Sequence, residues 1–132
     1  LAAKAVGVIP ARIAKTLSFQ DGNGRALLVV AAGDCKIDNS KFKKAFTMKA
    51  KMLSPEEVQR LTGHEIGGVC PFANPEGTRV YLDQSLRRFE TVFPACGSSH
   101  SAIELNCDDL FTVSRALAWV DVCKPIVRDE AL

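Results

Sequence analysis

The segment 15–32 constrains the fold most, because it has the pattern of a β-hairpin. Residues 15–20 alternate between apolar and polar side chains, which is typical of a strand with one buried face. The next four residues, Asp21–Gly24 (DGNG), are a strong hairpin-turn signal. The run 25–32 (RALLVVAA) is apolar on both faces, as expected for a strand at the centre of a sheet. We therefore expect a sheet built around two antiparallel strands.

Two helices are predicted after this hairpin. Ser54–Glu57 (SPEE) is a capping box with proline at the first helical position, and it predicts a helix over 55–62 that ends at Gly63. An N-cap cluster at 38–40 precedes a shorter basic helix over 41–46. The residues expected to face the core from this shorter helix are Phe42, Ala45 and Phe46.

The second half of the chain interleaves short elements. We expect strands at 78–83, 90–95 and 101–105, a helical turn at 84–88, and a helix that begins at Asn106 or Asp108 and ends near Ser114. The apolar run 116–122 fits either a strand or a helix. Hairpins beside longer crossovers favour a single α+β domain over residues 1–132, with a mixed, strongly twisted sheet flanked by helices.

Composition excludes several classes of protein. A chain of 132 residues with 47% hydrophobic residues suits one compact domain, and a net charge of +2 does not by itself indicate a nucleic-acid binder. The longest apolar run, 26–32, is too short to cross a bilayer, so we expect no membrane partner. The five cysteines have no disulfide-framework or zinc-finger spacing, which fits a reducing cytoplasmic location. They are Cys35, Cys70, Cys96, Cys107 and Cys123.

A basic stretch stands out against this near-neutral balance. The range 41–51 contains five lysines and no acidic residue: Lys41, Lys43, Lys44, Lys49 and Lys51. Such a cluster can contact phosphate groups, or it can be a solvated helix face. The sequence leaves both interpretations open.

Two glycine-bearing loops contain the residues best suited to a ligand site. The first, 62–72, holds Gly67 and Gly68, whose backbone N–H groups can approach a ligand closely. The second spans 96–100 and includes Gly97 and Ser98. The only two histidines of the chain, His64 and His100, lie one in each loop, where either could act as a general base or a metal ligand. Each loop could also be a plain turn.

Three further side chains are candidates for chemistry. Lys15 lies where the alternating run begins, and its ammonium can serve as a point charge for phosphate or an oxyanion; the alternative is a surface lysine. Asp83 ends a predicted strand, where it can bind a substrate amine or cap the helical turn at 84–88. Cys70 can pair with a histidine as a nucleophile, or it can be a structural residue.

Four blocks of the sequence together resemble the YbaK family. They are 14–19 (AKTLSF), 67–72 (GGVCPF), 80–83 (VYLD) followed by Ser85 and Leu86, and 95–98 (ACGS). This family comprises free-standing relatives of the editing domain inserted in bacterial prolyl-tRNA synthetase. The blocks keep the family's order from about residue 10 to about residue 122. Cys70 departs from the Ser or Thr that is often found there, Ala73 replaces a common Gly, and the N-terminal helix is shortened.

The resemblance implies hydrolysis of mischarged aminoacyl-tRNA without a metal, a cofactor or a protein nucleophile. Lys15, Gly67 and Gly68 would be the catalytic residues, with glycine N–H groups stabilising charge on the ester carbonyl and Lys15 holding a terminal phosphate or ribose. Water or the neighbouring ribose hydroxyl would attack or assist. The implied substrate-binding residues are His64, Val69, Cys70, Pro71, Phe72, Asp83, Gly97 and Ser98.

The implied partners are the acceptor end of a mischarged tRNA and, in addition, an aminoacyl-tRNA synthetase. The five lysines of 41–51 would contact the tRNA backbone. Because editing sites select by excluding larger side chains, we expect a small amino acid such as Ala, Ser, Thr or Cys. Two alternatives stay open: a non-catalytic module that binds tRNA or a synthetase, and a thiol-dependent hydrolase that uses Cys70 and His64.

Overall fold

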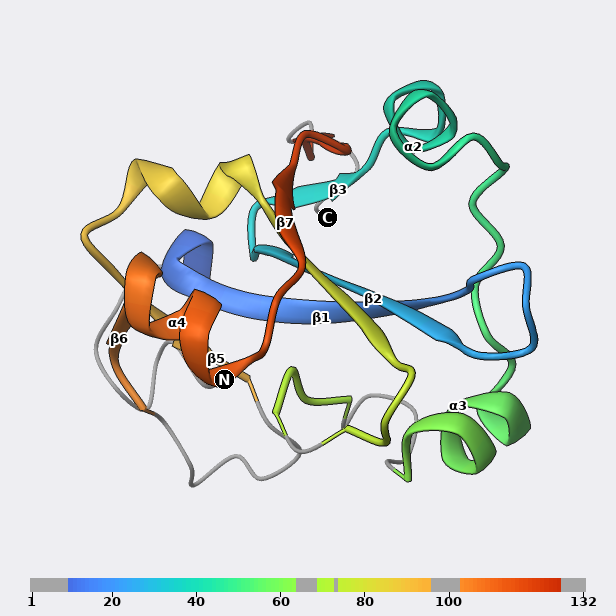
Figure 1. The fold of residues 1–132 in the computed structure, drawn as a ribbon. Helices are drawn as coiled ribbons and strands as arrows, with labels where there is room; N and C mark the ends of the chain where they lie inside the picture. The colour runs from blue at the N-terminus through green and yellow to red at the C-terminus, as the bar shows by residue number, and fades with distance from the viewer. Residues whose placement is uncertain (1–9, 64–68, 73, 96–102, 127–132) are drawn as a thin grey trace.

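The structure is a computed structural model that describes residues 10–63, 69–72, 74–95 and 103–126. It contains a six-stranded sheet in the order β6-β5-β1-β2-β4-β7 and a two-stranded sheet of β3 and β8 (Figure 1). The strands are β1 (Ile13–Gln20), β2 (Ala26–Ala32), β3 (Cys35–Ile37), β4 (Arg79–Asp83), β5 (Thr91–Pro94), β6 (Leu105–Asn106), β7 (Ala118–Val120) and β8 (Cys123–Pro125). The helices are α2 (Asn39–Phe46), α3 (Pro55–Thr62) and α4 (Cys107–Val113), and the 3-10 turns are η1 (Pro10–Arg12) and η2 (Gln84–Arg88).

The predicted β-hairpin is confirmed as the centre of the fold. β1 and β2 pair antiparallel, and all seven residues of β2 are buried. Asp21 closes the turn, because its Oδ1 accepts hydrogen bonds from the backbone N–H groups of Asn23 and Arg25. β2 also pairs in parallel with β4, so it lies inside the sheet, as its apolar sequence predicts.

The remaining pairings make the sheet mixed. β1 pairs with β5 and β4 pairs with β7 in parallel, whereas β5 and β6 are antiparallel. Helices lie around this twisted sheet, with α2 and α3 on separate sides of the hairpin in Figure 1. The prediction of one α+β fold with a mixed sheet flanked by helices is confirmed.

Local capping determines where the two predicted helices begin and end. Asp38 accepts a hydrogen bond from the backbone N–H of Lys41 at 3.0 Å, and α2 ends at Thr47 in the left-handed conformation. The capping box of Ser54 and Glu57 is present at the start of α3, and Gly63 ends that helix with φ 77°. These bounds follow from short-range hydrogen bonds, which is why the sequence predicts them.

α2 packs on the sheet through a chain of aromatic rings. The ring centroids of Phe19 and Phe42 are 4.9 Å apart, those of Phe42 and Phe46 are 4.7 Å apart, and those of Phe46 and Tyr81 are 4.9 Å apart. Phe42 is fully buried. The prediction that Ala45 faces the core is wrong, because the aromatic residues fill the contact and leave Ala45 exposed.

The structure differs from the sequence-based expectations in the short strands. The expected strand at 101–105 is wrong for its described part, because pairing there begins only at Leu105 and extends to Asn106. The ambiguous run 116–122 contains a strand, β7. The small sheet of β3 and β8 was not predicted at all.

None of the helices in the described ranges is long and apolar enough to span a membrane.

Candidate active site

Lys15 lies on the face of the large sheet that α2 covers. It is opposite Ala31 on β2, and two residues along β1 the same face carries Leu17 opposite Val29. Val29 is opposite Tyr81 on β4, so the next residues of that face on β2 and β4 are Ala31 and Asp83. The sheet therefore places Lys15 and Asp83 on one face, one on each side of Ala31.

The side chain of Lys15 is half-buried and makes no hydrogen bond or ion pair with another described residue. A lysine in this position has its apolar stem against the sheet, and its ammonium can bind a negatively charged ligand or donate a hydrogen bond to a polar one. The residue is not fully exposed, and its role in a ligand site stays a prediction.

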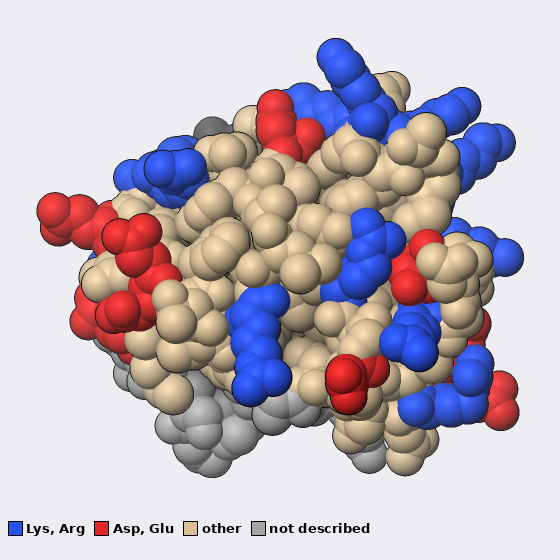
Figure 2. Space-filling model, viewed as in Figure 1, with Lys and Arg blue, Asp and Glu red and all other residues tan. Residues whose placement is uncertain are grey.

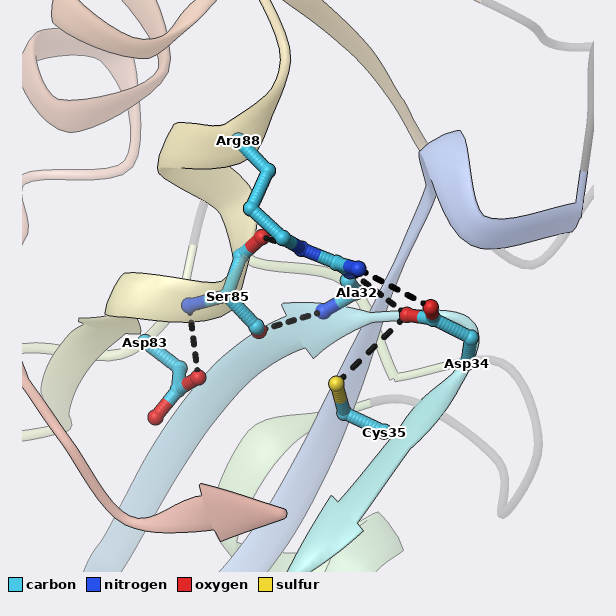
Figure 3. Close-up of polar contacts among 6 residues, drawn as sticks. All are labelled: Ala32, Asp34, Cys35, Asp83, Ser85 and Arg88. Atoms are coloured by element: carbon cyan, nitrogen blue, oxygen red, sulfur yellow. Dashed lines mark hydrogen bonds and ion pairs between the residues drawn. The ribbon is translucent and has the colours of Figure 1, made fainter. Parts of the chain in front are cut away.

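Asp83 is only 2% exposed, and both of its carboxylate oxygens accept backbone hydrogen bonds. Its Oδ2 accepts from the N–H of Ser85 at 2.9 Å, which caps η2, and its Oδ1 accepts from the N–H of Val122 at 2.9 Å. Figure 3 shows the contact with Ser85. The helix-cap alternative is therefore confirmed, and binding of substrate by Asp83 stays a prediction.

The buried thiol of Cys123 lies within the electrostatic reach of both charges. Burial raises the pKa of Cys123 strongly, the Asp83 carboxylate raises this pKa further, and the ammonium of Lys15 lowers it. Burial and the adjacent Asp34 carboxylate also raise the pKa of Cys35. Both groups are thus thiols at neutral pH, which makes them poor nucleophiles.

A polar network holds the end of β2 against η2. The N–H of Ala32 donates to Ser85 Oγ at 3.1 Å, and Arg88 binds both oxygens of Asp34, at 3.0 and 2.6 Å (Figure 3). Arg88 Nε also donates to the carbonyl of Ser85 at 2.8 Å. These contacts join the chain that follows Asp83 to the end of β2 and to Asp34, which follows it.

The chain reaches the side of Lys15 at the end of β5, just before the second glycine segment in sequence. Pro94 on β5 is opposite Ala14 on β1, and the N–H of Ala95 donates to the carbonyl of Ala14 at 2.9 Å. Gly97 and Ser98 follow Ala95 in sequence and lie outside the described residues. The strand β5 therefore brings the chain to the neighbourhood of Lys15 just before these two residues.

The first glycine segment is described at Thr62, Gly63 and from Val69 to Phe72; His64, Gly67 and Gly68 lie outside the described residues. Val69 and Cys70 are each 8% exposed, and Pro71 is buried. Asn74 Nδ2 donates to the carbonyl of Cys70 at 2.9 Å. Cys70 is therefore buried, with its carbonyl held by Asn74.

Pro71 also lines an open hollow of about 750 Å³. Its other walls come from 74–78, Val80 and 113–115. Side chains alternate along a strand, so Val80 faces the opposite side of β4 from Asp83. The structure thus brings Lys15 and Asp83 together on one face, and it places Pro71 at a hollow whose lining does not include them.

The five lysines of 41–51 do not share one environment. Lys41 Nζ donates to Asp121 Oδ1 and to the carbonyl of Cys123, each at 3.0 Å. Lys43 and Lys49 instead line a smaller hollow, together with Asn39, Ser40 and Ala50. Lys41 is therefore engaged within the protein, whereas the other four lysine side chains are exposed.

Sequence reasoning missed the contribution of Val122 and Cys123 to this region. Val122 directly precedes β8, and Cys123 begins it; this strand has only three residues and ends at a proline, so it carries no periodic signal. Within the described ranges, no group of three or more His, Cys, Asp or Glu side chains is arranged to hold a metal ion.

A mixed sheet thus carries Lys15 and the capping Asp83 on one face. Residues 1–113 match the aminoacyl-tRNA editing domain family, and the chain belongs to this family. The family resemblance inferred from the four sequence blocks is thereby confirmed.

The chain is similar to the uncharacterized Bacillus subtilis (strain 168) protein YwhH, with 57% identity over 123 residues, covering 93% of this chain and 78% of that protein. It is 33% identical over 84 residues to the proline–tRNA ligase of Aquifex aeolicus (strain VF5), covering 63% of this chain but only 15% of the ligase. It also resembles a crystal structure described as a proposed trans-editing enzyme for prolyl tRNA synthetase, with a TM-score of 0.82 and 30% identity. That match covers 93% of this chain and 77% of the other.

Proposed function

We propose that this protein is a deacylase that hydrolyses mischarged aminoacyl-tRNA carrying a small amino acid. The observation that carries the proposal is the half-buried side chain of Lys15, which makes no hydrogen bond or ion pair with a described residue. Lys15 also lies beside β5, the strand that precedes Gly97 and Ser98 in sequence. Membership of the editing-domain family and the similarity to a proposed trans-editing enzyme support it.

The reaction needs little chemical activation, because an aminoacyl ester is already reactive. The oxygen of a water molecule adds to the ester carbonyl, and the bond between that carbon and the ribose oxygen then breaks. The ribose oxygen takes up a proton, so that the products are the free amino acid and the uncharged tRNA. The protein has to position the ester and stabilise negative charge on the carbonyl oxygen.

Lys15 binds the terminal phosphate or ribose of the tRNA in this proposal. The backbone N–H groups of Gly67 and Gly68 stabilise the oxyanion, and the neighbouring ribose hydroxyl assists the attacking water. The residues that surround the substrate are His64, Val69, Cys70, Pro71, Phe72, Asp83, Gly97 and Ser98. A synthetase is the further partner that we propose, because related sequence occurs within a proline–tRNA ligase.

Selection of a small amino acid follows from how apolar pockets discriminate. One methylene group changes discrimination by only about 1–3 kcal/mol, so a site that excludes larger side chains is more effective than one that prefers a close fit. In this proposal the buried Val69, Cys70 and Pro71 would form part of the wall that sets this limit. Ala, Ser, Thr and Cys are the amino acids that we expect.

The test is release of amino acid from a panel of mischarged tRNAs that carry Ala, Ser, Thr, Cys, Leu or Phe. We expect hydrolysis of the small esters and not of the Leu or Phe esters, with no change on addition of EDTA. Binding of tRNA without release from any of the six would show a non-catalytic binding module. Equal hydrolysis of all six would contradict selection by size.

A further inference from the structure

The surface around α2 is strongly basic, and its lysines are arranged around a groove. In Figure 2, Lys and Arg side chains gather over the side of the molecule where α2 lies, and Asp and Glu side chains gather over α4. α2 has no acidic residue in its first turn and carries Lys43 and Lys44 in its last turn. The first turn of α4 contains Asp108 and Asp109.

The groove is the smaller hollow described above. It has a volume of about 360 Å³ and is lined by Asn39, Ser40, Lys43, Lys49 and Ala50. The left-handed conformation of Thr47, with φ 60°, turns the chain back at the end of α2, and its N–H donates to the carbonyl of Lys43 at 2.8 Å. This reversal brings Lys49 to the groove that Lys43 lines. The side chains of Lys43 and Lys49 make no hydrogen bond or ion pair with another described residue.

The groove lies on the side of the sheet that carries Lys15. α2 packs on this face through Phe42 against Phe19, and Phe19 shares its face of β1 with Lys15. The start of α2 is fixed near Asp83, because the N–H of Asp38 donates to the carbonyl of Val122, whose own N–H binds Asp83. The groove, on α2, and Lys15, on β1, therefore belong to the same side of the sheet.

We propose that this groove binds phosphate groups of the tRNA acceptor stem while the aminoacyl end is at Lys15. Two ammonium groups that have no anionic partner among the described residues, beside the amide of Asn39 and the hydroxyl of Ser40, match the charge and hydrogen-bonding capacity of consecutive phosphates. Of the five lysines, Lys43 and Lys49 make the contacts. Lys41, which is paired with Asp121, and Lys44, which lies outside the lining of the groove, do not. This inference rests on the proposed function for the identity of the ligand as tRNA.

The test compares single-lysine variants that remove the same charge from neighbouring positions. Lys43→Gln and Lys49→Gln change the groove, whereas the matched control Lys44→Gln removes an exposed charge from the same helix outside the lining. Binding of uncharged tRNA is measured between about 50 and 200 mM salt, the range over which phosphate contacts change affinity most visibly.

We expect each groove variant to weaken tRNA binding about threefold to tenfold at low salt and to reduce the slope of log K against log salt by about one. The control variant should bind within about twofold of the unchanged protein. Equal losses for Lys43→Gln and Lys44→Gln, or unchanged binding for both groove variants, would overturn the proposal.

A second measurement separates this inference from the proposed function. Hydrolysis of a 3′-aminoacyl adenosine, which lacks the acceptor stem, should be unaffected by Lys43→Gln and Lys49→Gln, whereas KM for mischarged tRNA should rise. If the protein binds tRNA through the groove but hydrolyses no ester, the proposed function is wrong and the proposal that the groove binds tRNA is supported. If ester hydrolysis is present and the groove variants keep their KM for tRNA, the groove proposal alone fails.

Discussion

Asp83 joins β4 to the start of β8, because its Oδ1 accepts the backbone N–H of Val122 at 2.9 Å while its Oδ2 accepts that of Ser85. This carboxylate is almost fully buried and lies on the same face of the sheet as Lys15. It therefore connects three elements at the border of the candidate active site.

We expect Asp83→Asn to destabilise the protein. The amide nitrogen of asparagine cannot accept a hydrogen bond, so one of the two buried N–H groups would lose its partner, at a cost of about 1–3 kcal/mol. Urea unfolding measures the change. The control Asp109→Asn, at an exposed position on α4, should change the free energy of unfolding by less than about 0.5 kcal/mol. An unchanged unfolding midpoint for Asp83→Asn would contradict the capping role.

The pair of Asp34 and Arg88 predicts a pH dependence of stability. The hydrogen bond from Arg88 lowers the pKa of Asp34 in the folded protein below its ordinary value of 3.8. The contribution of the pair is therefore present above pH 3.8 and is lost as pH falls through the lowered pKa. Because both side chains are more than a third exposed, we expect it to be below about 1 kcal/mol.

Urea unfolding between about pH 2 and pH 6 measures this dependence. Asp34→Asn removes the titrating group, so the difference in stability between the original protein and the variant should shrink as pH falls. A difference that stays constant across this range would show that the pair contributes nothing that depends on ionisation.

The thiols behind the candidate site should be unreactive in the folded protein. Burial and the Asp83 carboxylate raise the pKa of Cys123, and each unit of increase reduces the thiolate fraction about tenfold at a given pH. We expect iodoacetamide at pH 8 to label Cys123 more than about tenfold more slowly in the native protein than in urea. Peptide mass spectrometry reports the rates, and equal labelling in both states would contradict the raised pKa.

Local signals in the sequence predict the elements that close over short distances. The turn at Asp21, the capping box of Ser54 and the end of α3 at Gly63 all depend on hydrogen bonds or backbone conformations within a few residues. β8 could not be predicted in this way, because Cys123–Pro125 becomes a strand only by pairing with the distant Cys35–Ile37. Such pairing leaves no periodic pattern in three residues.

The sequence predicts some residues of the candidate site but not the contacts that distinguish them. Lys15 and Asp83 follow from their positions at strand residues, and their common face follows from the pairing of β1, β2 and β4. The sequence could not separate Lys41 from Lys43 and Lys49, because only the folded chain brings Asp121 to Lys41. Likewise, only the folded chain shows the cap role of Asp83, because it brings the N–H groups of Val122 and Ser85 to the two carboxylate oxygens.

The central claim is that Lys15, and not a cysteine, supports ester hydrolysis. Single-turnover release of amino acid from mischarged tRNA, measured for Lys15→Ala and Cys70→Ser, tests it most directly. Urea unfolding of both variants confirms that they fold. We predict a loss on the order of 10² in rate for Lys15→Ala, because Lys15 holds the terminal phosphate or ribose of the tRNA and so positions the ester. For Cys70→Ser we predict a change within a few-fold. Unchanged release by folded Lys15→Ala, or loss of release with Cys70→Ser alone, would contradict this account.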